Sequence, residues 1–144
     1  MPSIDSTIVI RASMPRVFDL ISRPQVFAEC SQYIVQIVPF GKNKYHWEVH
    51  AAGITLGWDS VTTAYRRPEH LAWRSITGIE NSGSYTLSQT NGGTLLTFEM
   101  DYHLPSKLFD AVAAPLSEPF VQAAIMEVLE SIKGRLENDS KPDS

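Results

Sequence analysis

Residues 71–105 read LAWRSITGIENSGSYTLSQTNGGTLLTFEMDYHLP and carry the clearest structural pattern in the chain. We interpret them as three short strands joined by polar turns that contain glycine. The turn Asn91-Gly92-Gly93 is typical of a β-hairpin. After this turn every second residue is apolar: Leu96, Phe98, Met100 and Tyr102. Because side chains alternate along a strand, the pattern predicts a sheet that is apolar on one face and hydrated on the other.

The amino-terminal half extends this pattern. We expect further strands at Ile4–Arg11, Tyr33–Phe40, Lys44–Ala51, Ile54–Tyr65 and His70–Ile76, and a turn region at Gly78–Gly83. Two short helices are expected after the first strand. Ser13 is a candidate N-cap and Pro15 suits a first helical turn. The second short helix is expected from Pro24 to Cys30.

The carboxy-terminal part changes to a helical period. A short helix is expected at Leu108–Ala114. Ser117-Glu118-Pro119 then combines a capping hydroxyl, an acid and a proline, which is typical of a helix start. An apolar stripe follows at spacings of three and four residues: Val121, Ile125, Val128, Ile132 and Leu136. This stripe predicts one long amphipathic helix.

The chain has 144 residues and shows no repeat or linker, so we expect one domain over residues 1–137 and a disordered polar tail at 138–144. Strands in a run followed by one long helix indicate the α+β class. A helix is about 10 Å wide. A curled seven-stranded sheet, at about 4.8 Å per strand, is roughly three times wider. Either large side chains close the gap between them, or a pocket remains.

Composition limits the classes of function. The formal net charge of −4 argues against non-specific nucleic-acid binding, which needs a basic face. No apolar run reaches the length of a membrane span, and the first residues lack the features of a signal peptide. Cys30 is the single cysteine, so no disulfide forms within the chain. We therefore expect a soluble, cytoplasmic protein.

Several motifs occur together along the chain. They are Ser13-x-Pro15-x-Val17-Phe18, Trp58-Asp59-Ser60, Trp73-Arg74-Ser75-x-x-Gly78-x-x-Asn81-x-Gly83, Gly93-Thr94, Tyr102-x-x-Pro105 and Leu129-x-x-Ile132-Lys133. In this combination the chain resembles the SRPBCC superfamily, also called START-like or helix-grip proteins, and is most similar to its polyketide cyclase/dehydrase and coenzyme Q-binding START-type branch. The resemblance implies a seven-stranded curved antiparallel sheet wrapped around a long carboxy-terminal helix. It also implies a cavity between them that holds lipids, quinones, hormones or polyketides, and only a minority of such proteins are enzymes.

Alternation along the strands and the helix stripe predict which side chains face this cavity. They are Tyr45, Trp47, Trp58, Ser60, Trp73, Tyr85, Leu87, Phe98, Met100 and Tyr102 from the sheet, and Phe120, Ala124 and Val128 from the helix. These residues either form a closed core or line a pocket. Apolar walls with a few polar groups are typical of a small-molecule site, and buried Tyr hydroxyl and Trp N–H groups need partners.

No catalytic residue, metal site or cofactor is predicted. His46 and His50 share a strand face with Glu48, but no third ligand stands at a suitable spacing. In strict alternation Asp59 and Glu99 point away from the cavity, which counts against proton-transfer catalysis. A β-bulge in its strand would turn Asp59 inward.

The favoured function is binding of a hydrophobic small molecule in the cavity, as carrier or sensor; the resemblance implies a lipid, quinone or polyketide-like ligand. The first alternative is a cofactor-independent enzyme resembling polyketide cyclases or dehydratases. The second is a protein-interaction module. No nucleic-acid partner or integral membrane segment is expected, and the oligomeric state is left open.

Overall fold

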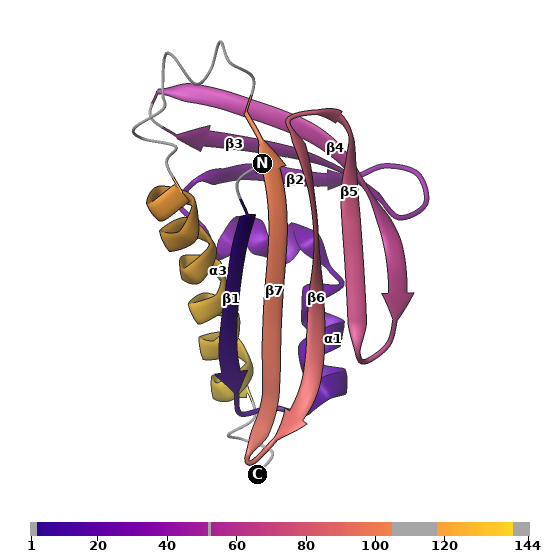
Figure 1. The fold of residues 1–144 in the computed structure, drawn as a ribbon, viewed down its shortest axis with the longest axis vertical. Coiled ribbons are helices and arrows are strands. Elements are labelled where there is room, and N and C mark those ends of the chain that lie inside the picture. The colour runs from indigo at the N-terminus through magenta and orange to yellow at the C-terminus, as the bar shows by residue number, and fades with distance from the viewer. Residues whose placement is uncertain (1–2, 52, 105–117, 140–144) are drawn as a thin grey trace.

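The computed structural model describes residues 3–51, 53–104 and 118–139. Its elements are β1 (Ser3–Ile10), α1 (Met14–Ile21), the 3-10 helix η1 (Pro24–Glu29), β2 (Ile34–Pro39), β3 (Lys44–Ala51), β4 (Ile54–Arg66), β5 (His70–Gly78), β6 (Glu80–Thr90), β7 (Gly93–His103) and α3 (Glu118–Asp139). Within these residues seven strands form one antiparallel sheet in the order β1-β7-β6-β5-β4-β3-β2 (Figure 1). The predicted α+β class, with two short helices after the first strand and a long helix at the end, is confirmed.

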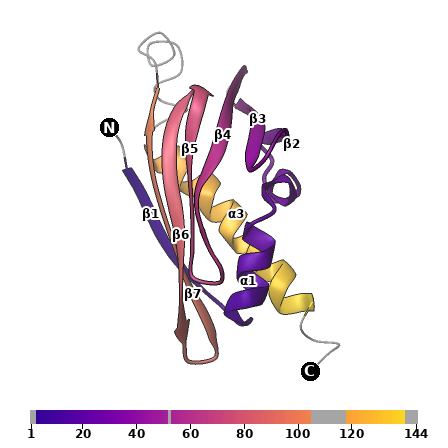
Figure 2. The ribbon, with the colours of Figure 1, turned by 90° about the vertical axis from the view of Figure 1, so that its right-hand side faces the viewer.

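The sheet curls, and α3 lies on its concave side. In Figure 1, β2 and β3 run across the top of the upright strands β1, β7 and β6. Figure 2 shows α3 running obliquely across the other side of the molecule, with α1 beside its lower half. The pairing of β4 with β5 shifts between Asp59 and Ser60 and again between Thr62 and Ala64. Such bulges bend a strand and increase its twist, which helps the sheet to wrap around the helix.

The hairpin between β6 and β7 lies where the sequence places it. Thr90 pairs with Gly93, so Asn91 and Gly92 form the turn, and Gly92 has a φ of +83°. Glycine adopts this left-handed conformation without the steric penalty that a Cβ brings. Both strands have 11 residues, however, and are longer than the short strands expected there.

The prediction of a turn region at Gly78–Gly83 is wrong. The chain reverses at Gly78 and Ile79, and β6 already begins at Glu80. Gly78 has a φ of +80°, which allows a reversal that needs few residues. Asn81 and Gly83 are therefore strand residues, and they share the inner face of β6 with Tyr85.

The predicted helix starts and ends agree in part with the structure. Ser13 caps α1, and its hydroxyl accepts a hydrogen bond from the Arg16 backbone N–H at 3.4 Å. The predicted helix at Leu108–Ala114 and the predicted cap at Ser117 lie outside the described residues. The last helix continues to Asp139, past the expected end of the domain at residue 137.

α1, α3 and the sheet meet at the lower end of the molecule in Figure 1, and the most deeply buried part of the core lies on these elements. Its fully buried apolar side chains are Ile10, Val17, Phe18, Ile21, Leu96, Leu129 and Ile132. The sheet and the two helices together therefore shield these residues from solvent.

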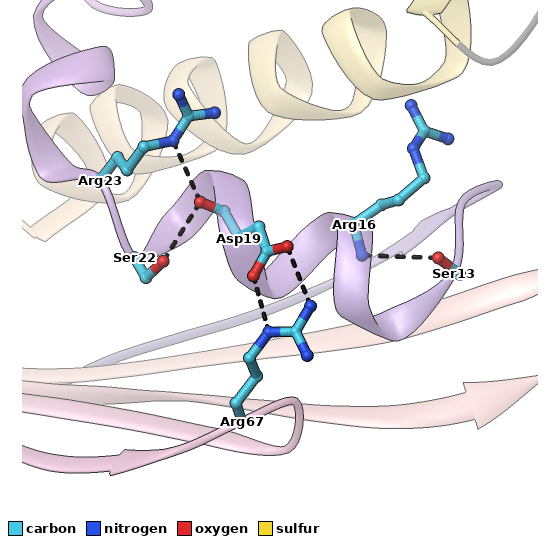
Figure 3. A network of polar contacts seen from close by, with 6 residues as sticks. All are labelled: Ser13, Arg16, Asp19, Ser22, Arg23 and Arg67. Atoms are coloured by element: carbon cyan, nitrogen blue, oxygen red, sulfur yellow. Dashed lines mark hydrogen bonds and ion pairs between the residues drawn. The ribbon is translucent and has the colours of Figure 1, made fainter.

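An ion pair fastens α1 to the turn between β4 and β5. Arg67 donates to both carboxylate oxygens of Asp19, at 2.8 and 3.0 Å (Figure 3). The hydrogen bond from Arg67 lowers the pKa of the Asp19 carboxyl below its usual value. On the opposite side of Asp19, its backbone carbonyl accepts hydrogen bonds from Ser22 and Arg23. The pair lies in solvent, so it orients α1 more than it stabilises the fold.

Polar contacts also hold α3 in place along its length. Glu127 accepts hydrogen bonds from the backbone N–H and the side-chain amide of Gln32, at 3.0 and 2.9 Å. Near the end of the helix, Glu137 accepts from the backbone N–H of Arg11 at 3.0 Å. On the β1 side, Gln122 donates to the hydroxyl of Ser6. The helix is thus tied both to the segment after η1 and to the first strand.

Candidate functional site

A cavity of about 270 Å³ lies between the sheet and the amino-terminal half of α3. Its volume is close to the lower end of the roughly 300–1,000 Å³ typical of small-molecule sites. It is also several times the roughly 30 Å³ that one water molecule occupies in the liquid. The walls come from β2 to β7, η1, α3, Ile21 at the end of α1, and short connecting segments. The space is thus large enough for an organic ligand and is bordered by six of the seven strands.

One wall is the indole of Trp73, which β6 holds in position. The Trp73 Nε1–H donates to Asn81 Oδ1 at 3.0 Å, and the Asn81 side-chain amide donates to the Ile79 carbonyl at 3.0 Å. Gly83 lies beneath the indole, and a Cβ at this position would be 2.6 Å from Trp73 Cη2. The Trp73, Asn81 and Gly83 motif therefore has a physical role: the asparagine orients the ring, and the glycine leaves room for it.

A second wall is formed by the stacked pair Trp47 and Trp58. The two residues are register partners on β3 and β4, and their rings lie 5.5 Å apart with an interplanar angle of 13°. The Trp47 Nε1–H donates to Ser60 Oγ at 3.1 Å. Aromatic side chains that are ordered in this way offer flat apolar surface at low conformational cost.

Tyr85 on β6 lies beside Trp73 and is only 6% exposed. Its ring centroid is 5.3 Å from that of Phe98 and 5.5 Å from that of Trp73. Burial raises the pKa of the Tyr85 hydroxyl, and the nearby Cys30 adds to this shift. The phenol therefore stays protonated at neutral pH.

Tyr102 on β7 is equally buried and also borders the cavity. Burial raises the pKa of its hydroxyl, and the negative charge of Glu118 at the start of α3 acts in the same direction. Two neutral phenol groups therefore face the cavity from neighbouring strands.

All predicted cavity residues except Leu87 border the cavity. The residues that do so are Tyr45, Trp47, Trp58, Ser60, Trp73, Tyr85, Phe98, Met100, Tyr102, Phe120, Ala124 and Val128. Leu87 is on the same face of β6 but packs into the closed core, where it is 3% exposed. It pairs with Leu96, which is also fully buried, in the part of the sheet that α1 covers.

Some cavity residues were not accessible from the strand pattern. Phe27 belongs to η1, and Ser31 and Tyr33 belong to the segment that follows it. Alternation predicts facing only within strands, so it gives no information on Phe27 and Ser31. Tyr33 was expected to begin a strand, but β2 starts one residue later, at Ile34. Asn81 was missed because its segment was interpreted as a turn. Its presence in a motif with Trp73 was a signal that could have identified it.

Charged side chains are absent from the described part of the cavity wall. Its residues include aromatic, aliphatic and hydroxyl side chains and Asn81, but no Asp, Glu, His, Lys or Arg. Asp59 instead lies on the outer face, where its carboxylate is 2.6 Å from His46 Nδ1.

The bulge near Asp59 does not turn this residue inward. Between the pairs Asp59–Thr77 and Ser60–Ser75 the additional residue, Ile76, lies on β5. The alternation of β4 is therefore intact at this point, and both neighbours of Asp59, Trp58 and Ser60, face the cavity.

Metal ligands do not gather anywhere in the described residues. Over the ranges that the structure describes, no three His, Cys, Asp or Glu side chains lie closely enough together to hold a metal ion. No helix in those ranges has both the length and the apolar character that a membrane crossing requires.

The curled sheet and the long helix on its concave side form the helix-grip, START-like fold, which solved structures share. The chain belongs to the family described as polyketide cyclase / dehydrase and lipid transport, whose model matches residues 1–137. The resemblance inferred from the sequence motifs is thereby confirmed. A comparison with curated proteins gives no match.

Solved structures share this fold at low sequence identity. The protein TTHA0849 from Thermus thermophilus is 16% identical with a TM-score of 0.84, over 96% of this chain and 99% of that one. The Zhui aromatase/cyclase from Streptomyces sp. R1128 is 16% identical with a TM-score of 0.71, over 94% and 93%. A START superfamily protein from Mycobacterium smegmatis is 12% identical with a TM-score of 0.71, over 94% and 97%. At these identities the likeness concerns the fold alone.

Proposed function

We propose that this protein binds a neutral, mostly apolar small molecule in the cavity and acts as a carrier or sensor for it. The observation that carries the proposal is the chemistry of the wall: aromatic and aliphatic side chains with a few hydroxyls, and no charged group among the described residues. Each 100 Å² of apolar ligand surface removed from water contributes about 2.5 kcal/mol. Burying an ionised ligand group without a partner opposes this gain strongly.

The aromatic surfaces support a flat ligand. Trp47 and Trp58 are stacked, and Trp73, Tyr85 and Phe98 form a second group of rings with centroids 5.3–5.7 Å apart. Rings prefer offset or edge contacts with other π-systems, so a conjugated ligand gains more here than a flexible chain of equal area.

An enzyme similar to the cyclases is less well supported. Proton transfer usually relies on His, Asp, Glu or Lys within reach of the substrate. The described cavity wall offers tyrosine, serine and threonine hydroxyls instead. Because burial raises the pKa of Tyr85, this phenol is a poor base at neutral pH. Binding without chemistry fits this wall better.

The test compares two dyes that differ in charge. N-phenyl-1-naphthylamine is neutral, and 1-anilinonaphthalene-8-sulfonate adds a sulfonate to the same ring system. We expect the neutral dye to bind with increased fluorescence and the sulfonate to bind at least about tenfold more weakly, because the cavity offers its charge no partner.

A pair of variants in α3 tests whether the dye fluorescence comes from binding in the cavity. Ala124 borders the cavity, whereas its neighbour Ala123 is exposed on the outside of α3. We expect Ala124→Phe to fill part of the space and to weaken dye binding about tenfold or more, and Ala123→Phe to leave the affinity unchanged. The proposal fails if the neutral dye does not bind, or if the two variants change its affinity equally.

A further inference from the structure

We infer that Tyr85 makes the cavity selective for ligands with a carbonyl-type oxygen, which accepts a hydrogen bond from its hydroxyl. This inference rests on the proposed function, since it assigns a polar preference to the same cavity. Three other rings confine the Tyr85 ring: Phe98, Trp73 and Phe27 lie at centroid distances of 5.3, 5.5 and 6.4 Å. A confined ring holds its hydroxyl at one place, so little entropy is lost when a ligand meets it.

The Tyr85 hydroxyl has no partner within the described protein. No hydrogen bond joins it to any residue of the described ranges. In those ranges, no fully enclosed side-chain oxygen or nitrogen lacks a partner. The Tyr85 hydroxyl therefore borders open space, and at this buried residue that space is the cavity it lines. A buried phenol normally has a hydrogen-bond partner, so a group inside the cavity is the natural one.

Two other polar groups of the wall already accept a hydrogen bond from an indole. Asn81 Oδ1 already accepts from Trp73, and Ser60 Oγ already accepts from Trp47. The hydroxyl hydrogens of Ser60 and Tyr85 remain available. An uncommitted phenol O–H that points into an apolar cavity matches a ligand that carries an acceptor. A carbonyl oxygen meets this requirement without the charge of a carboxylate or the surplus donors of an amine.

The experiment uses two tricyclic probes that differ at one carbon. Fluorene carries a CH₂ group where 9-fluorenone carries C=O, and the ring systems are otherwise matched. Affinities are measured by displacement of N-phenyl-1-naphthylamine from the full chain. We expect the wild type to bind fluorenone about three- to tenfold more tightly than fluorene, as one buried hydrogen bond predicts.

Variants then assign the preference to one hydroxyl. Tyr85→Phe keeps the ring and its packing, and we expect it to abolish the preference while fluorene affinity stays within about twofold. Tyr65→Phe is the matched control, because Tyr65 is 56% exposed and does not line the cavity. It should retain the full preference.

Three results overturn the inference. They are equal affinity of the wild type for both tricycles, a preference that survives Tyr85→Phe, and a preference that Tyr102→Phe removes while Tyr85→Phe does not. In each case dye binding persists and the proposed function stands. If the dye and both tricycles fail to bind, the proposed function falls together with the inference.

Discussion

The two halves of α3 present the same kind of apolar stripe and meet different surroundings. In the carboxy-terminal half, Ile132 and Leu136 are 0% and 5% exposed. In the amino-terminal half, Val121, Ile125 and Val128 are only partly buried and border the cavity. The helix therefore closes a core at one end and spans an open space at the other.

The difference comes from α1. At the lower end α1 lies beside α3 against the sheet, and its Val17, Phe18 and Ile21 are fully buried. At the upper end the same sheet, now curled by β2 to β4, faces α3 across the cavity, which η1 and the last residue of α1 also border (Figure 2). A sheet much wider than one helix stays open wherever a second helix does not fill the gap. The cavity thus lies where α3 is the main helix over the sheet, and the stable core lies where α1 and α3 cover the sheet together.

The largest expected effect comes from truncating the same residue type in each half. Ile132→Ala should cost about 2–5 kcal/mol of unfolding free energy, because it leaves a hole in a closed core. Ile125→Ala should cost about 1 kcal/mol or less, since its side chain already borders open space. Urea denaturation of both variants measures the difference. Equal losses would mean that the two halves are packed alike.

The next effect concerns two glycines in different surroundings. Gly83→Ala places a Cβ 2.6 Å from Trp73 Cη2 and 2.3 Å from the Glu99 carbonyl. We expect a loss of about 1–3 kcal/mol and a displaced Trp73, visible as a shift in tryptophan emission. Gly134→Ala on α3 is the control, because no atom lies within 4 Å of its added Cβ. It should instead stabilise the protein by about 0.5–1 kcal/mol, since alanine favours the helix.

An unchanged stability of Gly83→Ala would show that the Trp73 indole is free to move away from β6. The wall of the cavity would then be adaptable and not preformed. The affinity of the same variant for the dye distinguishes a displaced Trp73 indole, which alters the cavity wall, from unfolding of the sheet.

The smallest effect concerns the ion pair that links α1 to the turn between β4 and β5. The hydrogen bond from Arg67 lowers the pKa of Asp19 below its usual 3.8. The pair therefore stabilises the folded state above that value, and its contribution is lost as the pH falls through the lower folded-state pKa. Asp19→Asn should lower the urea midpoint slightly at neutral pH, and the difference from the wild type should vanish near about pH 2.

Asp5→Asn is the matched control, because it removes an exposed carboxylate that has no ion pair among the described residues. Its midpoint should follow the wild type at both pH values. If the urea midpoint of Asp19→Asn differs from that of the wild type by the same amount at both pH values, the loss of the ion pair does not explain the difference.

The order of elements and the inward faces of the strands were accessible from local patterns. Side-chain alternation placed Trp47, Trp58, Phe98 and Tyr102 on the inner face because the strand period is independent of what lies opposite. The prediction of a turn at Gly78–Gly83 was wrong, because a polar segment with glycines has the same local pattern in a loop and in a strand. Here most of the segment belongs to β6 and positions the Trp73 indole. Leu87 was assigned to the cavity wall for a related reason. Alternation predicts which face of the sheet a residue is on, but not whether that part of the face borders the cavity or the closed core.

The amino-acid sequence by itself determined the α+β class, the curled sheet, the long amphipathic helix and the apolar character of what lies between them. These follow from periods and turn residues that act over a few positions. Only the tertiary structure decided where that apolar interior is closed and where it is open. The closure depends on α1 meeting α3, and the free hydroxyl of Tyr85 depends on which donors find partners across strands. Both are properties of contacts between distant segments, which no local pattern encodes.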